Sequence, residues 1–184
     1  GAEDAVVFTY VGSFAVYQGI DLLFDSLAAA MRQSPRAMCV IIGGSPGQIR
    51  ERREFLESQG IADRVRFIGS VDPDALPAYL RASDVLMTTR ISGRNSPLKV
   101  LDYLKAGRCI LATDIAANRQ ILDEHHAWMS PAEPKAFAEA IVRLAEDPNL
   151  REELAANGRD LLNTRYHYGY FRESIRKVYE RIKY

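Results

Sequence analysis

Short apolar runs recur along this chain of 184 residues, and each is followed by glycine or polar residues. They occupy residues 5–11, 38–42, 65–68, 85–88 and 109–113, and residues 127–129 form a shorter sixth candidate. Runs that are apolar at almost every position are typical of parallel strands that are covered on both faces. The sequence therefore predicts a buried sheet of about six strands.

Segments with helical spacing of apolar residues separate these runs. We expect helices over residues 20–31, 48–59, 74–82 and 96–107, a helical turn over 118–122, and helices over 134–146, 149–163 and 169–183. Strands that alternate with helices are typical of an α/β fold, here a three-layer, doubly wound parallel sheet with helices on both faces. We expect the common strand order 3-2-1-4-5-6, a helical C-terminus, and a single Rossmann-like domain over residues 1–184.

The overall charge is balanced. Lys plus Arg and Asp plus Glu each number 24, and this argues against a general nucleic-acid or membrane-surface binder. No apolar run approaches the roughly 20 residues that a membrane span needs. We expect a cytoplasmic protein that associates with the inner face of a membrane only peripherally, if at all. Cys39 and Cys109 fall in different strands, so no disulfide is expected.

The strand order places the expected ligand site. In a sheet of this order the connections diverge between strands one and four, and ligands bind outside the carboxyl ends of the strands at that point. The loops that meet there are residues 12–19 and 89–96. The second leads into a helix for which Ser96 is a suitable N-cap and Pro97 a suitable first residue. Free amides at this helix start, together with basic residues nearby, favour an anion.

Several stretches also carry a family resemblance. They are YVGSFAVYQGIDLL (10–23), VIIGGSP (40–46), VRFIGSVDPDALPAYLRASDVL (65–86) and NSPLKVLDYLKAGRCILATD (95–114). In this order and spacing they resemble the C-terminal, nucleotide-sugar-binding domain of group 1 (family 4) glycosyltransferases of the GT-B fold. The resemblance covers residues 5–165.

The resemblance implies transfer of a sugar from a nucleoside-diphosphate sugar, UDP- or GDP-linked, to an acceptor hydroxyl, with retention of configuration. It implies no further cofactor and no metal site. The expected partners are the sugar-nucleotide donor and an N-terminal acceptor-binding domain that this chain lacks, and no nucleic acid. The terminal helix resembles the one that packs back across the domain junction in such enzymes. This chain alone should bind donor without efficient turnover.

The residues themselves and the resemblance together indicate the site residues. Arg90 and Lys99 are the candidates for stabilising the leaving diphosphate. Asp102 occupies the position of the acidic residue that usually binds the ribose hydroxyls. The expected donor-binding residues are Gly12, Ser13, Gln18, Gly19, Gly69, Arg94, Asn95, Ser96, Leu98 and Asp102.

Three positions depart from the family pattern. Ser13 and Gln18 stand where many members have cations that contact phosphates, and Arg94 stands where the first of two acidic residues is usual. Basic charge on the second loop, from Arg90, Arg94 and Lys99, is one explanation. The competing explanation is a non-catalytic nucleotide-binding or interaction module on the same fold. An intrahelical Lys99–Asp102 pair is a purely structural alternative for those two residues. A sugar-nucleotide epimerase would need carboxylates placed for proton chemistry, and the sequence offers none.

Overall fold

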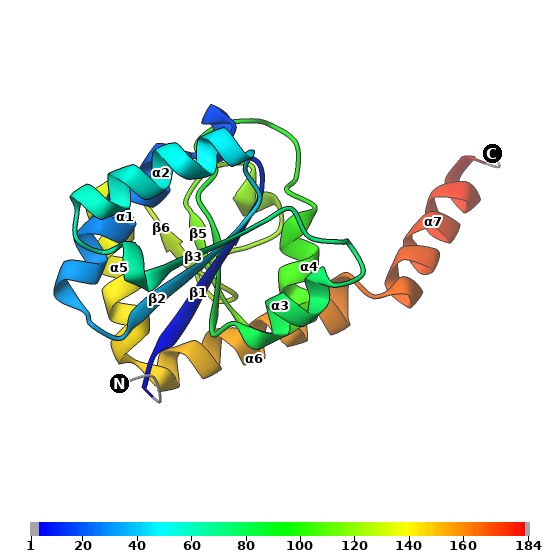
Figure 1. Ribbon diagram of the computed structural model, residues 1–184. Helices are drawn as coiled ribbons and strands as arrows, with labels where there is room; N and C mark the ends of the chain where they lie inside the picture. Colours follow the sequence, from blue (N-terminus) through cyan, green and yellow to red (C-terminus); the bar gives the residue numbers. More distant parts are fainter. Residues whose placement is uncertain (1–3, 183–184) are drawn as a thin grey trace.

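The computed structural model describes residues 4–182 and has a six-stranded parallel sheet at its centre (Figure 1). The order β3-β2-β1-β4-β5-β6 confirms the predicted 3-2-1-4-5-6. The strands are β1 (Val6–Val11), β2 (Ala37–Ile42), β3 (Val65–Gly69), β4 (Val85–Thr88), β5 (Cys109–Thr113) and β6 (Trp128–Ser130). All neighbouring strands pair in parallel, so their carboxyl ends share one edge of the sheet.

Helices cover both faces of the sheet, as the sequence predicts (Figure 1). They are α1 (Ile20–Gln33), α2 (Pro46–Ser58), α3 (Leu76–Ala82), α4 (Lys99–Ala106), α5 (Pro134–Glu146), α6 (Pro148–Arg165) and α7 (Tyr168–Ile182). Three short 3₁₀ turns are η1 (Val16–Gln18), η2 (Ala62–Arg64) and η3 (Asn118–Gln120). Apolar side chains of α1, α2 and α5 share one core with the sheet, those of α3 and α4 share the other, and α6 contributes to both.

The two cores follow from alternation along the strands. Phe8 and Tyr10 of β1 are fully buried on the side of α1 and α5, where they join Phe24 and Phe137. Leu86 and Ile110 of the central strands point to the opposite side and pack with α4. Because both faces are covered, the central strands are apolar at almost every position, and this is the pattern that identified them.

Helix α2 begins two residues earlier than predicted. Ser45 is its N-cap and forms a capping box with Gln48, and Pro46 follows at the start of the helix. Each side chain satisfies a backbone amide of the other, which fixes the first turn. The S-x-x-Q spacing typical of such a cap is present in the sequence at residues 45–48.

The predicted cap of the central helix is wrong. Helix α4 begins at Lys99, its N-cap position is Leu98, and no side chain caps it. Ser96 instead bonds through its hydroxyl to the side chain of Gln120. The Val100 and Leu101 amides donate to the Pro97 and Leu98 carbonyls three residues back, so a tight turn precedes the helix.

Helix α7 projects from the body of the molecule beside the end of α6 (Figure 1). The helix was predicted to end at residue 183, which lies outside the described residues. Its exposed apolar side chains are Tyr168, Tyr170, Phe171, Ile175, Val178 and Tyr179. None of the helices within residues 4–182 combines the length and the hydrophobicity that crossing a membrane requires.

Candidate functional site

A crevice of about 560 Å³ lies at the carboxyl edge of the sheet. Its walls are the loops that follow β1, β2 and β3, at residues 12–14, 43–45 and 70–73, together with Leu76 of α3. Two glycines make the close approach of the first two loops possible. Gly43 has φ +122°, and a Cβ there would overlap the Gly12 carbonyl oxygen. Only glycine fits such a contact.

The loops after β1 and β4 meet beside this crevice, as the strand order predicts. Gly19 has φ +67°, and a Cβ there would overlap the Thr89 carbonyl oxygen. The Thr89 hydroxyl donates to the Gln18 carbonyl at 2.8 Å, and the Ile91 amide donates to the Tyr17 carbonyl at 3.0 Å. Residues 12–19 and 89–98 are thus joined by backbone contacts in which glycine is required.

Lys99 connects α4 to the end of β1. Its Nζ donates to the Val11 carbonyl at 3.1 Å and to Gln18 Oε1 at 3.2 Å, and it lies 5.0 Å from the centroid of the Tyr10 ring. Burial, and secondly the charge of Arg90, lower the pKa of Lys99 to about 8. No carboxylate within residues 4–182 forms an ion pair with Lys99. This is therefore a partly buried cation whose charge is not neutralised by any of the described residues.

Arg90 shapes its own loop. Its guanidinium donates to the Ser92 carbonyl at 2.8 Å and to the Asn95 carbonyl at 3.0 Å, and it lies 5.6 Å from the centroid of the Tyr17 ring. Gly93 has φ +116°, and a Cβ there would overlap the guanidinium. Arg90 is close enough to Lys99 to lower its pKa, but it makes no hydrogen bond to the crevice wall within the described residues.

The rest of the second loop is exposed but tethered. Gln120 of η3 donates to the Arg94 carbonyl at 2.7 Å and also accepts the Ser96 hydroxyl. Leu98 is 73% exposed. Within residues 4–182 the Leu98 and Lys99 amides donate to no acceptor. The start of α4 therefore has open donors, as predicted, although Ser96 is not its cap.

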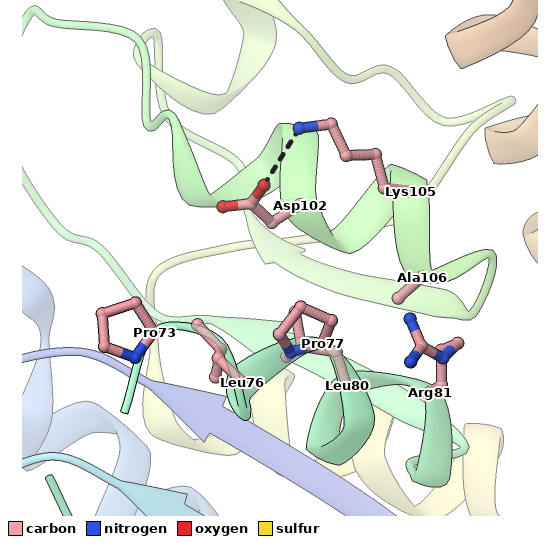
Figure 2. Close-up of a pocket in the computed structure, with 8 residues that line it drawn as sticks. All are labelled: Pro73, Leu76, Pro77, Leu80, Arg81, Asp102, Lys105 and Ala106. Carbon is pink, nitrogen blue, oxygen red and sulfur yellow. Dashed lines mark hydrogen bonds and ion pairs between the residues drawn. The ribbon is translucent and has the colours of Figure 1, made fainter. Parts of the chain in front are cut away.

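Asp102 follows Lys99 by three residues in α4. It lines a second pocket, of about 330 Å³, between α3 and α4 (Figure 2). Asp102 pairs with Lys105 at 3.3 Å, so the Lys99–Asp102 pair considered as a structural alternative does not form. Pro73 and Leu76 line both this pocket and the crevice. The two hollows are therefore neighbours.

The remaining predicted residues support the loops. Gly69 ends β3 with φ +75°, and its carbonyl accepts the Gly43 amide at 2.8 Å. Ser13 is exposed, and its carbonyl accepts the Tyr10 hydroxyl at 2.9 Å. The sequence reasoning missed Tyr10, which it treated only as a strand residue, and Gln120, for which no sequence signal was apparent.

Comparison with known families gives one match over most of the chain. The model of the glycosyl transferases group 1 family matches residues 5–147. A phosphatidyl-myo-inositol mannosyltransferase of Mycobacterium leprae is 29% identical over 168 residues, which are 90% of this chain and 43% of that protein. An alpha-D-kanosaminyltransferase of Streptomyces kanamyceticus is 22% identical over 99% of this chain and 47% of its own length. The chain thus spans less than half the length of these relatives.

Solved structures show the same fold. The C-terminal domain of a group 1 glycosyl transferase from Francisella tularensis superposes with a TM-score of 0.79 at 22% identity, covering 89% of this chain and 87% of that one. Anabaena HepE, solved in complex with UDP, superposes with a TM-score of 0.84 at 17% identity, covering 97% of this chain and 50% of HepE. The family match, which extends from β1 to the end of α5, shows that this chain belongs to the group 1 glycosyl transferases.

Proposed function

We propose that this chain is the donor-binding domain of a glycosyltransferase and that its crevice holds the diphosphate of a UDP- or GDP-linked sugar. The whole enzyme would transfer the sugar to an acceptor hydroxyl with retention of configuration. One observation carries the proposal. The Lys99 ammonium lies at the carboxyl edge of the sheet, and among residues 4–182 only neutral groups accept its hydrogen bonds. A buried charge without a counter-ion is costly unless a ligand supplies the opposite charge.

The position of Lys99 also accounts for the missing cations of the first loop. Gln18 stands where many family members have a lysine, and the Lys99 Nζ lies 3.2 Å from the Gln18 side chain. The cation is therefore a residue of α4 and not of the first loop, but its ammonium lies beside the first loop, residues 12–19. The open Leu98 and Lys99 amides add donors for a phosphate oxygen.

The neighbouring hollows offer room for the nucleoside. We propose that Asp102 accepts the ribose hydroxyls and that the loop at residues 70–73 lies beside the base. Lys105 would release Asp102 when the donor binds. This costs little, because both side chains are more than half exposed and exposed pairs contribute about 0–1 kcal/mol.

Transfer of the sugar leaves negative charge on the departing diphosphate. We propose that Lys99 meets this charge directly and that Arg90 adds positive potential while it holds residues 92–95 in place. In other enzymes, removing one such donor costs about 2.7–4 kcal/mol of transition-state stabilisation. The proposal requires no metal and no further cofactor.

The acceptor site is assigned to a separate N-terminal domain. Known relatives of this chain are about twice as long as the matched region, and α7 has an exposed apolar side suited to covering by another domain. Residues 1–184 then form a single donor-binding domain, and the expected cytoplasmic location remains a prediction.

Calorimetric titration with UDP, GDP and ADP tests the proposal. We expect one of the three to bind saturably, Lys99→Ala to weaken that binding at least tenfold, and Asp102→Ala to weaken nucleoside and nucleotide alike. Lys135→Ala is the matched control, because Lys135 lies in the first turn of α5 and is exposed. If none of the nucleotides binds to this chain or to the full-length protein, the donor-binding proposal is wrong and the non-catalytic interaction module is favoured.

A further inference from the structure

Three neutral groups surround the Lys99 ammonium. They are the Val11 carbonyl at 3.1 Å, Gln18 Oε1 at 3.2 Å and the face of Tyr10, whose centroid is 5.0 Å away. Of these, only the Gln18 group is a polar side chain that a substitution can change without altering the strand. The arrangement orients the lysine toward the Gly12 loop, since an ideal Cβ at Gly12 would lie 3.4 Å from the Nζ.

Gln18 is itself well anchored. Its carbonyl accepts the Thr89 hydroxyl at 2.8 Å, and the next residue, Gly19, has the left-handed conformation that ends η1 and begins α1. The backbone at Gln18 is therefore fixed between two loops, and its carboxamide is partly buried. Because the Gln18 backbone is fixed, its side chain can determine the position of the Lys99 ammonium.

The chemical type of Gln18 matters as much as its position. A carboxamide oxygen accepts a hydrogen bond from the ammonium but carries no net charge. A carboxylate there would neutralise Lys99 and compete with an anionic ligand, and a cation there would repel Lys99. Glutamine is thus a residue type that holds the cation while leaving its charge available.

We propose that Gln18 is a positioning residue that holds the Lys99 ammonium, uncompensated, against the Gly12 loop for the diphosphate of the donor. The inference rests on the proposed function and assigns a part of it to a residue that does not itself bind the ligand. It also explains why an uncharged residue is suitable at this position in a chain whose first loop has no cation.

The groups that face Lys99 come from three elements. Arg90, after β4, lowers the pKa of Lys99; Tyr10, on β1, has a pKa raised by burial and stays neutral; Gln18, on η1, is neutral at every pH. The charge of Lys99 therefore decreases as the pH rises through about 8. The terminal phosphate of UDP loses its second proton near about pH 6. Between pH 7 and 9.5 the lysine is the group of this pair that titrates.

The test uses this chain with Gln18→Leu and Gln18→Glu, each compared with the parent sequence. The first measurement is the Lys99 pKa in the absence of ligand. It is obtained from a pH titration of the NMR signal of the lysine Cε. We expect Gln18→Leu to lower this pKa by at least half a unit, because an acceptor of the ammonium is lost. Gln18→Glu should raise it by more than one unit. If Gln18 only filled space, Gln18→Leu would leave the Lys99 pKa unchanged, whereas the added charge of Gln18→Glu would raise it in either case.

The second measurement is the UDP dissociation constant between pH 7 and 9.5, with uridine as the reference ligand. We expect the UDP affinity of the parent protein to fall above about pH 8. In Gln18→Leu the UDP affinity should begin to fall at a lower pH. Gln18→Glu should bind UDP about tenfold more weakly than the parent at pH 7. Uridine affinity should be unchanged in both variants.

The outcomes separate the two proposals. If Lys99→Ala weakens UDP binding but Gln18→Leu changes neither the Lys99 pKa nor the pH dependence of UDP binding, the positioning role of Gln18 is wrong and the donor site stands. If the parent binds no nucleotide at any pH, the donor site is wrong and the positioning role fails with it.

Discussion

Replacing Lys99 with methionine should make the ligand-free protein more stable at neutral pH. The pKa of Lys99 is lowered from its ordinary 10.5 to about 8, chiefly by burial. At roughly 1.4 kcal/mol per pKa unit this corresponds to an upper limit of about 3 kcal/mol. Lys99 is only partly buried and water screens part of the cost, so we expect the free energy of unfolding to rise by roughly 1–3 kcal/mol at pH 7.

The pH dependence identifies the cause. The folded pKa lies below the unfolded one, so below pH 8 both states hold the proton and the folded state carries the full cost. Between pH 8 and 10.5 the folded state loses the proton first, and the cost disappears. The advantage of Lys99→Met should therefore be complete at pH 7 and absent by about pH 10.5.

Urea unfolding followed by circular dichroism at pH 7 and at pH 10 measures this difference. Raised pKa values of Cys39 and Tyr10, both caused by burial, change stability in alkali, but they are common to both proteins and cancel in the comparison. Lys135→Met is the control and should change stability by less than about 0.5 kcal/mol. A Lys99→Met variant that is less stable than the parent at pH 7 would refute the reasoning, because Lys99 would then be a structural residue.

Further substitutions test the loops and the caps. Gly19→Ala should destabilise the protein by at least about 2 kcal/mol in urea unfolding, because Gly19 has φ +67° and no space for a Cβ. Gly47→Ala should not destabilise it, because a Cβ at Gly47 would have no neighbouring atom within 4 Å. Equal effects of the two would contradict this. Ser45→Ala should cost about 1 kcal/mol through loss of the capping box, and Gln48→Ala should cost less. Gln120→Ala should weaken UDP binding several-fold by releasing the loop at Arg94 and Ser96, with thermal stability almost unchanged; unaltered affinity would show that the tether is dispensable.

The fold was accessible from the sequence because the strands are buried on both faces. Apolar runs such as that of β1 have no other simple interpretation when helices alternate with them, and the strand order then follows a common topology. Helix boundaries were less accessible where a side chain had two options. Ser96 could cap α4 or reach Gln120, and only the tertiary structure, which brings η3 to the loop, decides between them.

The site was predicted only in part, because its contacts likewise depend on the tertiary structure. Lys99 and Gln18 were identified separately from their positions in two loops, but their contact joins residues 81 positions apart and depends on the length of the lysine side chain. Tyr10 belongs to the site through the face of its ring, and a strand pattern contains no signal for this. Asp102 pairs with Lys105 because the Lys99 side chain instead reaches the end of β1, a contact that only the tertiary structure provides.

A crystal structure of this chain with UDP would test the central claim most directly. We expect the diphosphate between the Gly12 loop and the start of α4, with a phosphate oxygen within hydrogen-bonding distance of the Lys99 Nζ and of the Leu98 or Lys99 amide. Asp102 should then contact the ribose hydroxyls and no longer pair with Lys105. A diphosphate bound away from Lys99, with the lysine still held by Gln18 and Val11, would contradict the assignment of this crevice as the donor site.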